Sequence, residues 1–274
     1  MKRFLFLCAA ALFAVSSSAD TPNWQNPRVF QQGRMPMRST FYLYPSASQT
    51  RTDTYANSPF YRSLAGRWKF NWVEDAQGYP EDFYAVDYDD SSWGTIPVPG
   101  IWEMNGYGEP VYLNVGYAWR GNAPKNPPTV PIKENHVGSY RHSFTLPSDW
   151  RGKDVFIHFG SVTSCIELWI NGRRVGYSED SKLEAEFDIT PYLKSGENLL
   201  AARVMRWCDG SYLEDQDFWR LSGIARDVYI YARDKKRMLD IRITPDLVDD
   251  FSTGTLDVAA SFTRGVRSAE FCLW

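Results

Sequence analysis

The sequence is poor in cysteine and histidine, and it has no cluster of basic residues. Its 274 residues include four cysteines and three histidines, and no two cysteines stand in a Cys-x-x-Cys spacing. The histidines do not fall near the cysteines in a zinc-binding pattern. Lysine and arginine are dispersed and the formal net charge is −3, so the chain offers no electrostatic footprint for a phosphate backbone. These absences argue against a zinc site and against nucleic acid as a partner.

An apolar run near the N-terminus is too short to span a bilayer. Lys2 and Arg3 precede this run, which covers residues 4–15, and small residues follow it up to Ala19. The pattern is typical of a cleaved secretory signal. The large residues before Cys8 disfavour lipid anchoring. We therefore predict that residues 1–19 are a signal peptide and that the protein is secreted or periplasmic, with no membrane partner.

Three cysteines remain after the predicted signal, at Cys165, Cys208 and Cys272. Small secreted scaffolds stapled by disulfides carry a dense and even set of cysteines, whereas this set is odd and scattered through a long chain. At least one thiol is therefore expected to stay unpaired.

Alternation of apolar and polar residues with a period of two dominates the rest of the chain. The strand-like runs, separated by Gly, Pro, Asn or Asp, cover residues 68–72, 140–146, 155–159, 166–170, 198–207 and 227–231. Asn171 and Gly172 can supply the two positive-φ residues of a tight turn, which predicts a hairpin over residues 167–177. Many short strands joined by such turns predict an all-β fold, with a jelly-roll β-sandwich as its main body.

Prolines and strand spacing divide the chain after the signal into three parts. Residues 20–62 are polar and contain five prolines, and we expect them to form an N-terminal arm lying on a larger body. Residues 63–237 form the predicted jelly-roll domain. Residues 238–274 contain three strand-like runs, the last at 269–274, whereas an immunoglobulin-like sandwich needs about seven strands. We therefore expect a truncated immunoglobulin-like domain at the end.

One segment between two strand-like runs, residues 209–228, combines acidic and aromatic side chains. Its central acids are Glu214, Asp215 and Asp217, and they stand beside Phe218, Trp219 and Arg220. Carboxylates bind sugar hydroxyls and apolar rings cover the C–H faces of a sugar, so this combination is typical of a carbohydrate site.

Structural roles compete with binding roles for several of these residues. Acids in loops often cap turns or pair with nearby arginines, and we interpret Glu214 and Asp215 in this way. Tryptophan is more often a core residue than a sugar platform, so Trp207 and Trp219 are interpreted as core aromatics. For Asp217 the sequence pattern alone leaves both roles open.

Several long motifs carry a resemblance to one enzyme family. They cover residues 209–228, 168–178, 186–189, 196–199, 110–117 and 126–131, together with the pair Glu134 and Asn135. Taken in chain order, these motifs closely resemble the bacterial β-galactosidases of glycoside hydrolase family 2, over residues 26–274. The resemblance implies a five-domain enzyme, in which a jelly-roll sugar-binding domain and an immunoglobulin-like domain precede a catalytic (β/α)8 barrel. The barrel and its two catalytic glutamates have no counterpart in this chain, so no catalytic residue is assigned.

The resemblance also implies two contacts with the sugar. Asp217 matches an aspartate that contacts a galactose hydroxyl and shares a bound sodium ion. Asn114 matches a second galactose contact, although by pattern alone it would be an ordinary loop residue. The family's magnesium ligands lie in the barrel, so the resemblance implies that none of them is in this chain. Full-length members of the family often form oligomers.

Three hypotheses of function follow. In the first, the chain is the N-terminal sugar-binding region of a β-galactosidase, which hydrolyses terminal β-D-galactosyl residues with retention, and it is non-catalytic alone. In the second, it is a free-standing carbohydrate-binding module. In the third, it is an interaction fragment that assembles with a separately encoded remainder. We favour the first, with a β-galactoside as the partner, because the sequence stops inside a strand-like run.

Overall fold

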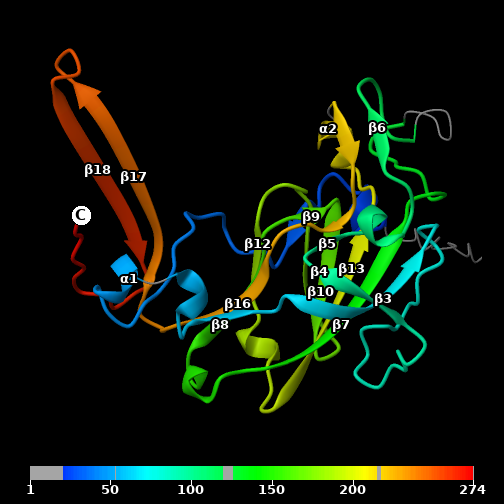
Figure 1. Ribbon diagram of the computed structural model, residues 1–274, viewed down its shortest axis with the longest axis horizontal. Coiled ribbons are helices and arrows are strands. Elements are labelled where there is room, and N and C mark those ends of the chain that lie inside the picture. The colour runs from blue at the N-terminus through cyan, green and yellow to red at the C-terminus, as the bar shows by residue number, and fades with distance from the viewer. Residues whose placement is uncertain (1–20, 53, 120–125, 215–216, 274) are drawn as a thin grey trace, which may run out of the picture.

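The computed structural model describes residues 21–52, 54–119, 126–214 and 217–273. Two antiparallel sheets form its main body (Figure 1). The larger sheet contains, in spatial order, β1 (Gln31–Gln32), β11 (Arg173–Ser178), β10 (Cys165–Ile170), β13 (Glu197–Met205), β7 (Val137–Thr145), β3 (Gly66–Val73) and β4 (Gly94–Val98). The smaller sheet contains β12 (Ala185–Asp188), β8 (Asp154–Phe159), β16 (Val228–Arg233) and β2 (Tyr61–Ser63). The predicted all-β sandwich is therefore confirmed.

Three smaller sheets and a few single-turn helices complete the described part of the chain. The small sheets are β5 (Gly100–Ile101) with β15 (Gly223–Ile224) and β9 (Val162–Thr163), β6 (Val111–Leu113) with β14 (Phe218–Arg220), and β17 (Met238–Val248) with β18 (Thr253–Phe262). The α-helical turns are α1 (Gln49–Thr52) and α2 (Ser211–Glu214), and the 3-10 turns are Asn23–Gln25, Tyr55–Asn57, Glu103–Asn105, Ser148–Trp150 and Thr190–Tyr192. None of the helices in the described ranges is long and apolar enough to cross a membrane.

The main hydrophobic core lies between the two large sheets. Trp68 and Tyr140 enter it from the larger sheet, and Ile157 and Ile230 enter it from the smaller one, all fully buried. Successive side chains of a strand point to opposite faces of its sheet, so the larger sheet also needs cover on its outer face. A second cluster supplies this cover with Phe83, Trp93, Trp169 and Ala201. The central strands are therefore buried on both faces.

The hairpin predicted from Asn171 and Gly172 is present between β10 and β11. Both residues have positive φ, at 52° and 79°, as a tight turn of this kind requires. Ile170 pairs with Arg173 directly across the turn. These φ values and this pairing confirm the predicted hairpin. Two adjacent residues that tolerate positive φ favour a tight connection of this kind, which is why it could be predicted from the sequence.

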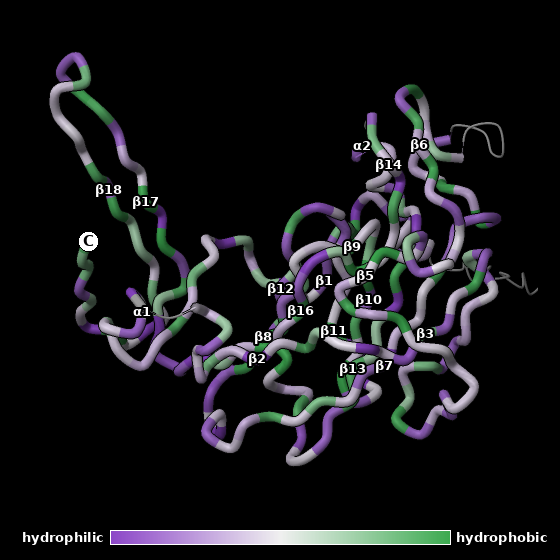
Figure 2. Tube along the Cα trace, viewed as in Figure 1, coloured by the Kyte–Doolittle hydropathy of each residue, from purple (hydrophilic) through white to green (hydrophobic). Residues whose placement is uncertain are grey.

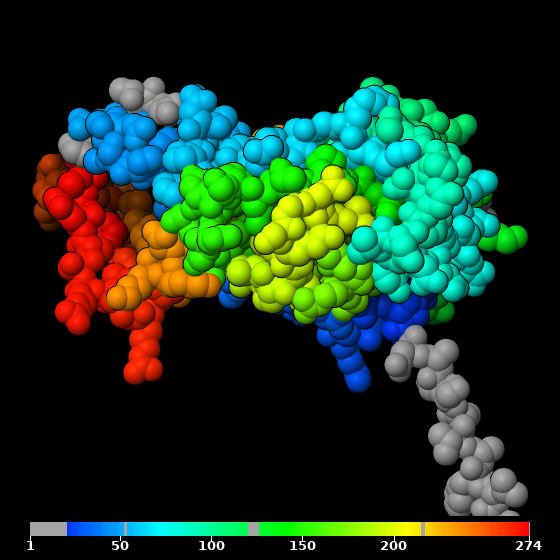
Figure 3. Space-filling model, turned by 90° about the horizontal axis from the view of Figure 1, so that it is seen from below, coloured from blue at the N-terminus to red at the C-terminus, as the bar shows by residue number. Residues whose placement is uncertain are grey.

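The N-terminal segment 21–62 contacts both sheets and the base of the β17–β18 hairpin. Strand β1 extends the larger sheet at β11, and β2 extends the smaller sheet at β16. Arg38 forms an ion pair with Glu186 of β12 at 2.8 Å, and the Ser39 amide donates a hydrogen bond to Asp240 of β17, also at 2.8 Å. Figure 3 shows the later part of this segment, in lighter blue, beside the C-terminal residues at one end of the molecule, whereas its first residues, in dark blue, lie along the sandwich.

Strands β17 and β18 form a long hairpin that projects from the sandwich (Figures 1 and 2). Several of its apolar side chains are exposed, including Ile243, Leu247 and Leu256. The strand predicted at 269–274 is not observed, because residues 269–273 have no regular secondary structure and Trp274 lies outside the described residues. A strand needs a hydrogen-bonded neighbour, and a favourable apolar pattern does not supply one.

Candidate functional site

The ribbon formed by β6 and β14 brings the two predicted sugar-contact residues together. Leu113 pairs with Phe218 at one end of this antiparallel ribbon. Asn114 is the next residue after β6, and Asp217 is the residue immediately before β14. Both are exposed. The structure therefore places them at the same end of the ribbon, whereas their contact with galactose stays a prediction.

A tyrosine on the neighbouring strand orients Asp217. The Tyr112 hydroxyl donates a hydrogen bond to Asp217 Oδ1 at 2.7 Å. This bond to a carboxylate raises the pKa of Tyr112. The bond from the tyrosine fixes one edge of the carboxylate, and no side chain in the described ranges donates a hydrogen bond to Oδ2. Tyr112 was missed from the sequence, where nothing marks it as a partner of a residue so far along the chain.

Trp219 lies opposite Tyr112 on the same face of the ribbon. Its side chain is 54% exposed, and that of Tyr112 is 51% exposed. The two ring centroids are 5.6 Å apart, with an angle of 54° between the ring planes. The core interpretation of Trp219 was therefore wrong. It holds for Trp207, which is buried and packs against Trp119.

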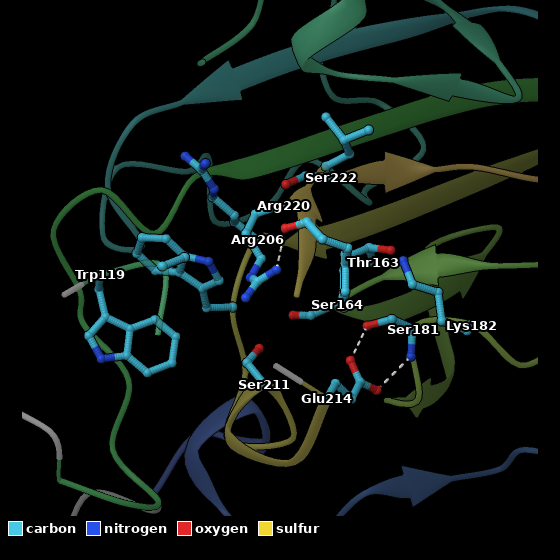
Figure 4. A pocket seen from close by; sticks show the side chains of 14 residues that line it. Trp119, Thr163, Ser164, Ser181, Lys182, Arg206, Ser211, Glu214, Arg220 and Ser222 are labelled. Carbon is cyan, nitrogen blue, oxygen red and sulfur yellow. Dashed lines mark hydrogen bonds between the residues drawn. The ribbon is translucent and has the colours of Figure 1, made fainter. Parts of the chain in front are cut away.

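The other face of β14 looks into a small cavity, shown in Figure 4. The cavity has a volume of about 50 Å³, and its lining includes Phe218 and Arg220 of β14 together with Trp119, Trp207 and Arg206. Phe218 and Arg220 alternate with Asp217 and Trp219 along the chain, as the pleat of a strand requires. The ribbon thus has one face turned inward and an open face that carries Tyr112, Asp217 and Trp219.

Glu214 has a structural role beside this cavity. Its carboxylate accepts hydrogen bonds from the backbone amide of Ser181, at 2.8 Å, and from the Ser181 hydroxyl (Figure 4). Burial raises the pKa of Glu214, and the bonds from Ser181 oppose this rise. The expectation of a structural role is supported, although the partner is a serine and not an arginine. Asp215 lies outside the described residues.

Two buried acids, Glu179 and Asp209, lie close together at the start of the 209–228 segment. The Tyr177 hydroxyl donates a hydrogen bond to Glu179 Oε1 at 2.6 Å. Burial raises the pKa of both carboxyl groups, and each lies within hydrogen-bonding reach of the other. Two carboxyls so placed hold a shared proton more firmly than isolated ones. This pair anchors the segment that leads into β14, and sequence reasoning missed it.

Residues 61–234 match the family model described as "Glycosyl hydrolases family 2, sugar binding domain". The chain belongs to glycosyl hydrolase family 2. The matched range contains both large sheets apart from β1, and it contains the whole β6–β14 ribbon. The candidate site therefore lies in the family 2 sugar-binding domain, while the β17–β18 hairpin follows it.

Named relatives support the same family. The chain is 42% identical over 240 residues to the β-galactosidase of Priestia megaterium, covering 87% of this chain and 23% of the relative. It is 42% identical over 245 residues to the β-galactosidase of Vibrio cholerae, covering 89% of this chain and 23% of the relative. The family 2 chain thus spans about a quarter of the length of the curated relatives it matches.

Solved structures show the same fold. A β-glucuronidase from an uncultured Clostridium species superimposes with a TM-score of 0.56 and 18% sequence identity, covering 82% of this chain and 36% of that one. A β-glycosidase from Bacteroides vulgatus gives a TM-score of 0.53 with 24% identity, covering 74% of this chain and 24% of that one. At these identities the likeness concerns the sandwich architecture.

The sodium site that the resemblance implies at Asp217 does not coincide with a cluster of acidic or imidazole side chains in the described part of the domain. No three His, Cys, Asp or Glu side chains come together within the ranges that the structure describes. Asp217 can offer Oδ2 to a cation, since its Oδ1 accepts the hydrogen bond from Tyr112. A sodium ion bound there would need further oxygen ligands from elsewhere.

Proposed function

We propose that this chain forms one wall of the galactoside-binding pocket of a β-galactosidase, and that the open face of the β6–β14 ribbon contacts a terminal β-D-galactosyl residue. The observation that carries the proposal is the convergence of Asn114, Asp217, Tyr112 and Trp219 from segments about a hundred residues apart. The relatives named above, which are β-galactosidases, support galactose as the sugar.

The chemistry of these side chains suits a sugar. A carboxylate accepts hydrogen bonds from two hydroxyl groups, and an amide both donates and accepts, so Asp217 and Asn114 together can distinguish the positions of sugar hydroxyls. An exposed indole ring such as that of Trp219 offers an apolar surface for the C–H face of the sugar.

Hydrolysis needs more than this wall. In the retaining mechanism two carboxyl groups flank the scissile bond, about 5–5.5 Å apart, one as nucleophile and one as acid and base. The β6–β14 ribbon approaches a ligand from one side. We therefore propose that bond cleavage depends on residues outside this chain, that Asp217 shares a sodium ion with them, and that magnesium is bound elsewhere in the enzyme. Export to the periplasm or beyond is part of the same proposal.

Titration of the purified chain with methyl β-D-galactoside, followed by NMR, tests the binding wall. We expect weak, saturable shifts of the Trp219 indole signal, which Asp217→Asn reduces strongly. The control is Asp246→Asn, on the exposed part of β17. A Trp219 signal that does not respond, or an equal response in both variants, would contradict the proposal.

A chromogenic β-galactoside tests the second part of the proposal. We expect no turnover by the chain alone. Turnover that Asp217→Asn abolishes would show that this chain carries its own catalytic groups. Tight galactoside binding without turnover would instead support a free-standing binding module.

A further inference from the structure

A second cavity lies between the N-terminal segment, the end of β16 and the base of the β17–β18 hairpin. Its volume is about 380 Å³, within the size range of small-molecule pockets. Its lining includes Met35, Arg38, Phe156, Arg233 and Leu239. The β6–β14 ribbon is at the other end of the molecule (Figures 1 and 2), so this cavity is separate from the proposed galactoside wall.

Arg233, the last residue of β16, is a buried cation that has no acidic partner among the residues that the structure describes. Its side chain is 3% exposed, and one terminal nitrogen, Nη1, donates a hydrogen bond to the Met238 carbonyl at 3.0 Å. Its Nε is buried and has no hydrogen-bond partner among the described residues. No carboxylate of the described chain lies within ion-pair distance of its guanidinium.

The two neighbouring arginines of the cavity are paired. Arg38 forms two hydrogen bonds with Glu186, from Nε at 3.0 Å and from Nη2 at 2.8 Å. Arg237 donates to Asp154 at 2.6 Å. Both therefore have a carboxylate in place, and Arg233 is the exception among the three.

The charge of the cavity lining follows from this difference. The lining carries the guanidinium groups of Arg38, Arg233 and Arg237 and the carboxylates of Glu186 and Asp240. Asp154, the partner of Arg237, is outside the lining and is shared with Lys235, so counting this second pair as well still leaves an excess of one positive charge. Burial and the nearby Arg38 lower the pKa of Arg233 to about 10, so it remains charged at neutral pH. The Arg233 guanidinium lies over the Phe41 ring, 4.2 Å from its centroid, but a ring gives no hydrogen-bond acceptor to the buried Nε. An anion that enters the cavity would supply this acceptor and lower the cost of burying the charge.

We propose that this cavity binds a small organic monocarboxylate, with the carboxylate on Arg233 and the apolar part against Met35, Phe156 and Leu239. The flat guanidinium fork of arginine matches the two oxygens of a carboxylate. One excess charge selects a monoanion over a dianion. The apolar walls select an organic acid over an inorganic ion.

Calorimetry with sodium benzoate tests this site, with benzamide as an uncharged ligand of the same shape. We expect saturable benzoate binding to the purified chain, and at least about tenfold weaker binding of benzamide and of sulfate. In Arg233→Met the benzoate affinity should fall by about tenfold or more, because the variant keeps the length of the side chain and loses its charge. Arg62→Met is the matched control, since Arg62 is exposed on β2, the neighbour of β16.

A second variant keeps the proposal open to refutation if Arg233→Met does not fold. Ser261→Phe places a ring at the cavity lining from β18 while Arg233 stays in place, and it should also abolish benzoate binding. Equal binding of benzoate and benzamide would overturn the proposal. So would tighter binding of sulfate than of benzoate, or wild-type affinity in Ser261→Phe.

Discussion

The Tyr112 hydroxyl donates a hydrogen bond to Asp217 Oδ1 at 2.7 Å, joining two residues that are 105 positions apart. Both lie on the open face of the β6–β14 ribbon, where Trp219 is the cross-strand neighbour of Tyr112. The bond fixes the orientation of an exposed carboxylate that would otherwise rotate. Under the proposed function, an oriented carboxylate beside an exposed aromatic pair lowers the cost of binding a sugar, because less freedom is lost on binding.

Tyr112→Phe should weaken galactoside binding with little effect on folding. The variant keeps the ring beside Trp219 and removes only the hydrogen bond that orients Asp217. The hydrogen bond has a charged acceptor but is exposed to solvent, which weakens it, so we expect a loss in affinity of about threefold to tenfold. NMR titration with methyl β-D-galactoside measures it.

Tyr84→Phe is the control for this prediction. Tyr84 also donates to an aspartate, Asp82, but over 3.5 Å and away from the ribbon, where its ring stacks on Trp169. The sugar affinity of this variant should equal that of the wild type. Equal losses in Tyr112→Phe and Tyr84→Phe would show that the hydroxyl of Tyr112 has no special role.

Glu179→Gln should change how stability depends on pH. Burial raises the pKa of Glu179 from 4.5 to about 8, so the folded protein holds a proton that the unfolded chain releases above pH 4.5. The free energy of unfolding therefore falls as pH rises from 4.5 towards 8, by up to about 1.4 kcal/mol per pH unit for one proton. Glutamine cannot ionise and should flatten this part of the profile. Urea unfolding over this pH range measures the difference.

The variant should also be more stable than the wild type near pH 8, where the wild-type carboxyl must ionise inside the protein. The exposed acid Glu81 provides the control, and Glu81→Gln should leave the profile unchanged. If the wild type gains stability between pH 5 and pH 8 through Glu179, the assignment of a proton to this buried pair is wrong.

Gly210→Ala should destabilise the segment that leads into β14. A Cβ atom at this position would lie 2.8 Å from Glu179 Oε2 and 3.4 Å from Cys208 Sγ. Gly210 is half-buried, but the side chains of Glu179 and Cys208 that the Cβ would meet are buried, and overpacking against buried atoms costs about 1–3 kcal/mol. Gly254→Ala on β18 is the control, because a Cβ atom there would meet nothing within 4 Å. Urea unfolding of the two variants should separate them, and equal stability would show that the acidic pair can move aside.

The fold could be predicted from the sequence where the signal is local. The alternation in residues 140–146 or 155–159 needs only a two-residue period, and the turn at Asn171 and Gly172 needs only two residues that accept positive φ. The run at 269–273 shows the limit of this reasoning. Its pattern suits a strand, yet pairing depends on a neighbour that no local pattern reveals.

The candidate site could be predicted only in part for the same reason. Asp217 and Asn114 were found through a resemblance, whereas Tyr112 became visible only through the pairing of β6 with β14. The exposure of Trp219 also depends on this ribbon, because a two-stranded ribbon at the margin of a sandwich keeps one face open. Propensity favoured a core role for Trp219, and tertiary structure overrode it.

Truncation of Trp207 should destabilise the fold, whereas truncation of Trp219, twelve positions later, should not. Trp207 is 6% exposed and packs against Trp119, so Trp207→Ala should lower the free energy of unfolding by about 3–5 kcal/mol. Trp219 is 54% exposed, so Trp219→Ala should leave stability within about 0.5 kcal/mol of the wild type. Urea unfolding of both variants, with far-UV circular dichroism to verify the fold, measures this contrast.

For galactoside affinity we expect the reverse, with a large loss in Trp219 variants and none in a Trp207 variant that folds. Trp219→Ala removes the apolar surface beside Asp217 and should abolish the response of the chain to methyl β-D-galactoside, whereas Trp219→Phe retains a ring and should restore part of it. A milder variant, Trp207→Phe, tests the buried site without full loss of packing, and its sugar affinity should match that of the wild type. If Trp219→Ala binds galactoside as well as the wild type does, the ribbon face is a bare surface and the sugar must approach the domain from another side.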